Sequence, residues 1–220
     1  FLGNHSILPV ADLMAIIWIT WAINMVGWSG GVDGQMPGFV AIAAFTIGLL
    51  SFNQISLENF PAWTGSTLAF ITCGAYLGFL YWNRFPQKIL PGYSAKALAG
   101  FLLATLAILN TAKLGTALLV LGVPAVDAVY VLVTRLLSKN DPTKPGRSHL
   151  HHRLLDAGWG KQKIALFYWI ISGILSVVAL TVNAKQKFFA GLAVVVGILA
   201  IILWLKLSTI FLRKSGPDNG

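Results

Sequence analysis

The sequence contains one cysteine, Cys73, and only seven acidic residues among its 220 positions. A single cysteine excludes an intrachain disulfide framework and any metal site built from several thiolates. Charged residues make up 10% of the chain and hydrophobic residues 56%, whereas soluble domains carry about 25% charged residues. Together with a mean hydropathy of +0.75, this composition argues against both a water-soluble domain and a disordered chain. It predicts an all-α, polytopic bundle of transmembrane helices.

Long apolar runs separated by glycine and proline predict about seven membrane spans, since one span needs about 20 mainly apolar residues. We expect them near residues 8–28, 36–52, 62–82, 96–112, 115–137, 164–183 and 188–212. They would form a single membrane domain, residues 1–213, followed by a flexible cytoplasmic tail, residues 214–220.

The positive charges divide unevenly between the two sides of this bundle, and that division predicts its orientation. Thirteen lie on one side: Arg84, Lys88, Lys96, Arg135, Lys139, Lys144, Arg147, Arg153, Lys161, Lys163, Lys206, Arg213 and Lys214. Three lie on the other: Lys113, Lys185 and Lys187. The first side is expected to be cytoplasmic, so the net charge of +9 reflects topology and no nucleic-acid partner is expected. The N-terminus would lie outside. A chain that starts at Phe1 without Met then indicates further spans upstream.

A glycine-rich loop, residues 27–34, follows the first span. It contains a formal G-x-S-x-G pattern, but the serine nucleophile elbow needs a strand-to-helix turn, and this loop follows a membrane helix. Backbone N–H groups of such a loop can approach a phosphate, and Asp33 beside them would suit Mg²⁺. The alternative is a plain turn in which Asp33 caps the next helix.

Two further segments on the same side carry polar chemistry. The positive charge of residues 83–94 suits phosphate binding, or is ordinary cytoplasmic-side charge. Residues 147–153 hold three of the four histidines between two arginines, which favours a diphosphate ligand through charge-assisted hydrogen bonds. Zinc binding and a solvated basic loop are the alternatives. Within the spans, Asn24 and Asp127 are interpreted as helix-packing hydrogen-bond groups or as site residues.

These segments resemble the polyprenyl-phosphate N-acetylhexosamine-1-phosphate transferases, glycosyltransferase family 4, over about residues 8–183. Residues 24–34 are similar to the family's N-A-V-N-L-x-D-G-x-D-G loop, and residues 83–92 to the start of N-x-x-P-A-K-I-F-M-G-D-T-G-S. Residues 121–127 and 147–155 are close to L-G-V-P-I-x-D and R-x-H-L-H-H-R-L-L, which resemble the undecaprenyl-phosphate GlcNAc-1-phosphate transferase branch most. The family's first spans, with their D-D-x-x-D loop, have no counterpart here.

The resemblance implies Mg²⁺-dependent transfer of a sugar-1-phosphate from a UDP-sugar to a polyprenyl phosphate in the plasma membrane of a bacterium. It implies Asp33 as catalytic residue and metal ligand. The expected substrate-binding residues are Asn24, Asn83, Lys88, Arg147, His149, His151, His152 and Arg153. A homodimer is a further expectation.

Three positions depart from the family pattern. Gly27 stands for its second Asn, Gly30 for the first Asp of D-G-x-D-G, and Tyr93 for the metal-ligand Asp of M-G-D. Tyrosine is a poor Mg²⁺ ligand at neutral pH because its pKa is about 10. The departures predict low activity. They leave open a catalytically inactive relative that binds lipid or nucleotide or acts as a membrane scaffold, and a fragment completed by another chain.

Overall fold

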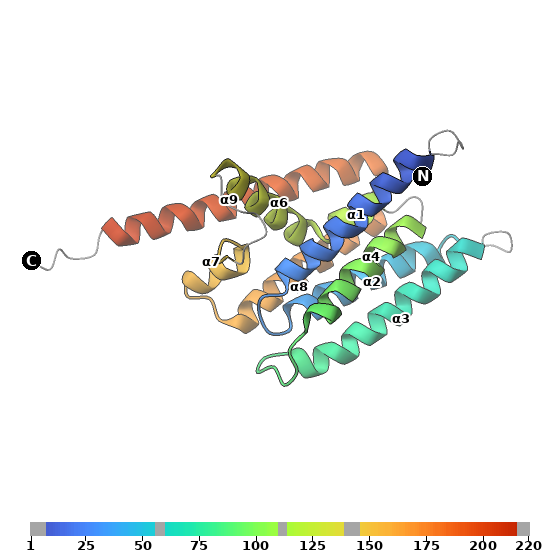
Figure 1. Ribbon diagram of the computed structural model, residues 1–220, viewed down its shortest axis with the longest axis horizontal. Coiled ribbons are helices and arrows are strands. Elements are labelled where there is room, and N and C mark those ends of the chain that lie inside the picture. The colour runs from blue at the N-terminus through green and yellow to red at the C-terminus, as the bar shows by residue number, and fades with distance from the viewer. Residues whose placement is uncertain (1–7, 56–59, 110–113, 139–145, 215–220) are drawn as a thin grey trace, which may run out of the picture.

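The computed structural model describes residues 8–55, 60–109, 114–138 and 146–214, and within these ranges it contains nine helices and no strand (Figure 1). The helices are α1 (Leu8–Ser29), α2 (Gln35–Phe52), α3 (Phe60–Asn83), α4 (Tyr93–Leu109), α5 (Leu114–Val120), α6 (Gly122–Leu137), α7 (Leu150–Asp156), α8 (Lys161–Thr181) and α9 (Ala184–Lys214). The predicted all-α class is confirmed. The predicted tail beyond Lys214 lies outside the described residues, and so do residues 139–145, between the fifth and sixth predicted spans.

Six of the seven predicted spans coincide with single helices, but the fifth does not. Residues 115–137 form α5 and α6, which are bent by 82° relative to each other. Pro124 explains the break, because it lacks an N–H and its ring would clash with the carbonyl of Val120, where α5 ends. The fifth predicted span is therefore a bent pair of helices and not a single helix.

By length and hydropathy, four helices of the described residues can cross a membrane, and the bent pair would make a fifth. The four are α1, α2, α8 and α9. Helix α3 has 24 residues, but threonine, glycine and aromatic side chains reduce its hydropathy, and α4 has only 17 residues. The predicted number of seven is not reached by these criteria, while the membrane helix bundle itself is confirmed.

Helix α2 lies at the centre of the bundle. It packs against α3 and α8, while α1 packs against α4, and α9 packs against α5 and α6 (Figure 1). The side chains of Phe39 and Ile47 on α2 are fully buried. Glycines permit close approaches between helices: Gly48 lies under the ring of Phe70, and Gly100 lies against the backbone of α1 at Ile23.

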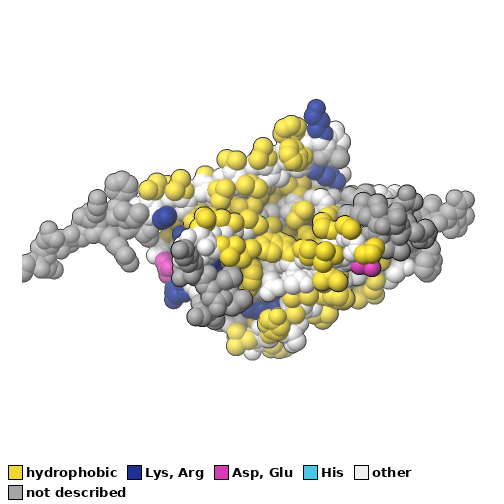
Figure 2. Space-filling view, turned by 45° about the horizontal axis from the view of Figure 1, so that its top comes forward, with side chains coloured by type: hydrophobic (Ala, Val, Ile, Leu, Met, Phe, Trp, Pro, Cys, Tyr) yellow, Lys and Arg dark blue, Asp and Glu magenta, His cyan; other side chains and the backbone are white. Residues whose placement is uncertain are grey.

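The outer surface of the bundle is apolar. Ile16 on α1, Ile71 on α3, Val177 on α8 and Trp204 on α9 are each more than 60% exposed. Figure 2 shows hydrophobic side chains over the middle of the visible face, with Lys and Arg near its margins. Apolar surface of this extent marks an interaction with a membrane, so this is a membrane protein.

Three connections meet at one end of the bundle. There the C-terminal ends of α1 and α3 lie near the N-terminal ends of α2, α4 and α8, with α7 beside them (Figure 1). Long-range hydrogen bonds join Gly34 to Asn83 and Asp33 to Lys161 at this end. Segments separated by more than 120 residues in the sequence, such as Asp33 and Lys161, therefore share one surface.

Candidate functional site

The connection between α1 and α2, here called the 30–34 loop (Gly30–Gly34), is held from two directions. Gly34 has a φ of 76°, a left-handed conformation that glycine adopts without strain, and this turns the chain into α2. Its N–H donates to Asn83 Oδ1 at 3.0 Å. Its carbonyl accepts from Trp169 Nε1 on α8 at 3.2 Å. Because α3 and α8 both contact the loop, its backbone is fixed relative to the bundle.

Asp33, the predicted catalytic residue and metal ligand, has an exposed fraction of only 5%. Its Oδ1 accepts a hydrogen bond from Lys161 Nζ at 3.0 Å, and its Oδ2 accepts one from the Gln87 backbone N–H at 3.3 Å. Both carboxylate oxygens are therefore engaged by other parts of the chain. The N-capping alternative is not formed, because the residue before α2 is Gly34 and no side chain caps that helix.

Asn83, a predicted substrate-binding residue, is 1% exposed and braces two loops. It accepts from Gly34 and donates through Nδ2 to Ile89 O at 2.9 Å and to Gln87 Oε1 at 3.2 Å. All of these partners belong to the 30–34 loop or to the α3–α4 connection. The amide thus positions the loops that carry Asp33 and Lys88.

A cavity of about 500 Å³ opens beside Asp33. It combines cationic, aromatic and apolar walls from three elements. Its lining residues are Asp33, Gly34, Tyr81, Arg84, Phe85, Pro86, Lys88, Gln162, Ala165, Leu166 and Trp169. Lys88 was expected here. Arg84 packs over the Tyr81 ring at 5.0 Å and Lys88 over the Trp82 ring at 5.6 Å, so neither cation is paired with a carboxylate among the described residues.

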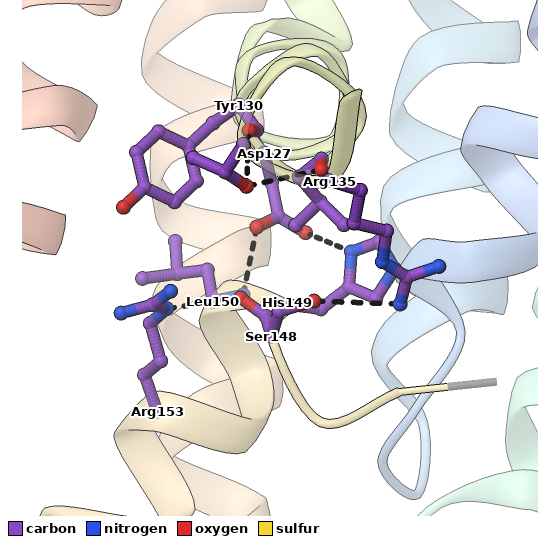
Figure 3. Close-up of polar contacts among 9 residues, drawn as sticks. Asp127, Tyr130, Arg135, Ser148, His149, Leu150 and Arg153 are labelled. Atoms are coloured by element: carbon purple, nitrogen blue, oxygen red, sulfur yellow. Dashed lines mark hydrogen bonds and ion pairs between the residues drawn. The ribbon is translucent and has the colours of Figure 1, made fainter. Parts of the chain in front are cut away.

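The histidine segment is anchored by Asp127, which is fully buried on α6 (Figure 3). Asp127 Oδ2 lies 2.9 Å from His149 Nδ1, and Oδ1 accepts from the Leu150 backbone N–H at 2.7 Å. His149 is the N-cap residue of α7, so a carboxylate from another helix satisfies the first amide of α7. Asp127 is therefore a helix-packing group, and its carboxylate positions the histidine segment.

His151 lies directly on the 30–34 loop. Its imidazole occupies the space where a Cβ on Gly31 would stand, and its exposed fraction is 2%. Burial, followed by the charges of His152, His149 and Lys96, lowers the pKa of His151 to about 3. The imidazole is neutral at pH 7, and its Nδ1 has no hydrogen-bond partner in the part of the chain that the structure describes. The pKa of His152 is also lowered, first by burial and then by the charge of Arg147.

The other predicted binding residues point to different partners. Arg147 forms an ion pair with Asp156 at 2.8 Å on the exposed surface. Arg153 donates from Nε to Ser148 O at 2.9 Å and lies over the Tyr130 ring. Asn24 donates to Thr20 O of its own helix at 2.8 Å, which is neither an interhelical bond nor a contact with the loops.

The residues present do not fit a Mg²⁺ site. No group of three or more His, Cys, Asp or Glu that could hold a metal ion occurs among the described residues. Tyr93, at the family's metal-ligand position, is 79% exposed at the start of α4. A Cβ on Gly30 would meet Met36 Cβ at 3.1 Å and Lys96 Cε at 3.2 Å, so a lysine lies where the pattern has an acid. The three-histidine zinc alternative is not supported either, because the three histidines are not among any group of ligands in the described residues that could hold a metal ion together.

Sequence reasoning missed Lys161, Lys96, Arg84 and Trp169. In the sequence, the three cations stand out only as part of the cytoplasmic-side charge, and Trp169 only as one residue of an apolar span. The indole of Trp169 fills the space beside Gly38, one helical turn from Gly34. Such a pairing across more than 130 residues is visible only in the fold.

Comparison with known proteins agrees with this architecture. A family model described as "Glycosyl transferase family 4" matches residues 3–111. A probable undecaprenyl-phosphate N-acetylglucosaminyl 1-phosphate transferase of Bacillus subtilis is 26% identical over 177 residues, 78% of this chain and 48% of the relative. A decaprenyl-phosphate N-acetylglucosaminephosphotransferase of Mycolicibacterium smegmatis is 29% identical, covering 96% of this chain and 57% of the relative. A phospho-N-acetylmuramoyl-pentapeptide-transferase of Thermoanaerobacter sp. is 30% identical, covering 70% of this chain and 47% of the relative.

The fold and the loop cluster define a polytopic helical membrane protein with a cation-rich site at one end of its bundle. The chain belongs to glycosyl transferase family 4, as the motifs predicted. It spans about half the length of the curated relatives it matches.

Proposed function

We propose that this protein binds a polyprenyl phosphate and a UDP-N-acetylhexosamine as substrates of sugar-1-phosphate transfer in cell-envelope polysaccharide synthesis. The observation that carries the proposal is the meeting of three loops at one end of the bundle. There His151 lies on Gly31, and Asp33 binds both Gln87 and Lys161. The relatives are named as transferases of this type, and the same three loops carry the resemblance to them.

The cavity beside Asp33 suits the lipid phosphate. Arg84 and Lys88 supply positive charge, while Leu166 and Trp169 supply apolar surface next to it. A polyprenyl phosphate has an anionic head and an apolar chain, so it matches this combination. The nucleotide diphosphate would lie along the 30–34 loop toward His151, where backbone N–H groups and a neutral imidazole can act as hydrogen-bond partners.

In the proposed reaction, a phosphate oxygen of the lipid attacks the β-phosphorus of the UDP-sugar. The bond from that phosphorus to the oxygen bridging the two phosphates breaks, and UMP leaves. The products are UMP and a lipid-diphosphate sugar. This chain's residues contribute orientation and neutralisation of the two anions, which repel each other as they approach.

Binding without transfer is the second candidate function. It is favoured by the exposure of Tyr93 and by the ion pair that occupies Asp33. Here the protein would hold a lipid or nucleotide, or act as a membrane scaffold, with the chemistry weak or absent.

The proposal includes a location. We propose the plasma membrane of a bacterium, because the relatives are bacterial, and a loop cluster that faces the cytoplasm, because Lys and Arg are unevenly distributed. A homodimer stays a prediction, which multi-angle light scattering of the detergent-solubilised protein would test.

The test combines UMP release from UDP-GlcNAc in the presence of polyprenyl phosphate with calorimetric binding of UDP-GlcNAc. We expect binding, and release about a thousandfold slower than that of a relative, because lost charge stabilisation of several kcal/mol reduces the rate about tenfold per 1.4 kcal/mol. Release at a relative's rate would eliminate the second candidate. Absence of UDP-GlcNAc binding would overturn the transferase proposal and leave only a lipid-binding or scaffold role of the second candidate.

A further inference from the structure

The ion pair between Asp33 and Lys161 occupies the position where the family pattern calls for a metal. Asp33 is buried, whereas the Lys161 side chain remains 45% exposed, so its ammonium group can be reached from solvent. Lys161 is also the first residue of α8, where the free backbone N–H groups and the helix dipole add positive potential. A divalent cation could reach Asp33 Oδ1 only by displacing this ammonium group.

Lys96 brings a second positive charge to the same loop. Its Cε lies 3.2 Å from the position of a Cβ on Gly30, and its charge acts on His151. Within the described residues, its side chain forms no hydrogen bond and no ion pair. The Lys96 ammonium group is therefore available to an anionic ligand at the 30–34 loop.

The acids at this end of the bundle leave that charge uncompensated. Among the described residues, Asp127 is bonded to His149 and Leu150, and Asp156 is paired with Arg147. Asp33 offsets one of the two lysines at the loop. A phosphate group would meet a net positive site here, while a divalent cation would be repelled by two ammonium groups.

We infer that Lys161 and Lys96 provide at the 30–34 loop the positive charge that a divalent cation provides in a carboxylate-rich site, so that this protein binds a nucleotide diphosphate without a metal ion. The inference rests on the proposed function, because it assumes that the loop binds a nucleotide diphosphate. It adds that this binding is independent of divalent metal and weakened by removal of either lysine.

The test measures UDP binding by calorimetry in detergent, with excess EDTA and with excess MgCl₂. We expect the two dissociation constants to agree within about twofold, which is a small difference in binding free energy compared with a tenfold change. Binding that requires MgCl₂ would overturn the inference and leave the proposed function intact. Absence of binding under both conditions would count against the proposed function itself.

Lys161→Gln and Lys96→Gln test whether these two lysines contribute to UDP binding beyond the overall positive charge of the protein. Each should weaken UDP binding about tenfold in EDTA, because one charge-assisted contact is lost. Lys163→Gln is the matched control: Lys163 is two residues from Lys161 on α8, but it packs over the Trp159 ring and is not the lysine that pairs with Asp33. In Lys161→Gln, added MgCl₂ should recover part of the affinity for UDP, since Asp33 Oδ1 is then free.

Equal effects of the Lys161 and Lys163 substitutions on UDP binding would contradict the inference. If Lys161→Gln fails to fold, Lys96→Gln and the EDTA comparison still decide it.

Discussion

Gly31 determines whether the histidine segment can lie on the 30–34 loop. The His151 ring fills the space beside its Cα, and the ring is buried on its other sides. Any side chain at this position must push the imidazole away. The contact between the 30–34 loop and the histidine segment, about 120 residues apart in the sequence, thus depends on the absence of a side chain at Gly31.

We expect Gly31→Ala to displace His151 and to weaken UDP binding about tenfold or more, with a stability loss of about 1–3 kcal/mol from overpacking. Calorimetric binding and thermal unfolding in detergent measure the two effects. Gly27→Ala is the control, because no atom lies within 4 Å of a Cβ at that helical position. Unchanged UDP affinity in Gly31→Ala would separate His151 from the nucleotide site.

His151 also predicts a pH dependence of stability. Its pKa is about 3 in the folded protein, against an ordinary value of 6.5. Between these two pH values, the imidazole is protonated in the unfolded chain and neutral in the folded protein. Stability is full above pH 6.5 and falls as the pH drops toward 3, by about 1.4 kcal/mol per pH unit. The difference between the wild type and His151→Gln, measured by unfolding from pH 7 to pH 4, isolates this residue. Equal pH profiles of the two proteins would contradict the burial of His151.

At the scale of elements, α7 has only seven residues and depends on α6 for its position. Asp127 joins them by binding the N-cap residue and the first amide of α7. A short helix whose first amide is bonded by one buried carboxylate, and whose Leu150 and Leu154 pack in the core, is a local unit whose loss need not unfold the bundle. The position of all three histidines therefore depends on a side chain from a separate helix.

We expect Asp127→Ala to destabilise the protein by about 3 kcal/mol, because a buried amide and His149 Nδ1 lose their partner. Limited trypsin digestion should cleave faster at Arg147 and Arg153. Asp156→Ala serves as control, since its ion pair with Arg147 is exposed and is worth about 0–1 kcal/mol. Equal protease resistance of the wild type and Asp127→Ala would show that α7 is held by other contacts.

The sequence predicted the positions of the helices better than the contacts between distant residues. Hydropathy located all but one of the long helices, because a span is a local property of about 20 residues. The break at Leu121 was missed although Pro124 signals it, because the apolar run continues through the bend. At the site, the motif order predicted Asp33, Lys88 and the histidines as site residues, and their functional roles stay a prediction. Lys161 could not be assigned to Asp33, since nothing local in the sequence links two residues that far apart.

For the whole molecule, the distribution of charge predicts one orientation in the membrane. Ala157, after α7, belongs to the loop cluster, whereas Lys185 is the second residue of α9, beyond the opposite end of α8. Both positions are exposed. Their accessibility from the two sides of a cell membrane therefore reports the topology.

In a Cys73→Ala background, we expect an impermeant thiol reagent added to intact cells to label Lys185→Cys and not Ala157→Cys. Labelling of Ala157→Cys should appear after the membrane is opened. The reason is the positive-inside rule, which places the Lys- and Arg-rich loops in the cytoplasm. The reverse labelling pattern would invert the orientation and move the proposed site outside the cell.

The Asp33–Lys161 ion pair also shapes how this site could be re-engineered. Gly30→Asp introduces a carboxylate beside Lys96, where it gains an ion pair and so becomes unavailable to a metal. Tyr93→Asp adds an acid at the exposed start of α4, while Asp33 stays neutralised by Lys161. Gly30→Asp is therefore masked by Lys96, and Tyr93→Asp leaves Asp33 paired with Lys161, so the effects of these substitutions depend on one another. A combinatorial library that varies positions 30, 93, 96 and 161 together would be needed to cross this barrier, whereas stepwise selection for metal-dependent turnover would stall at the first substitution.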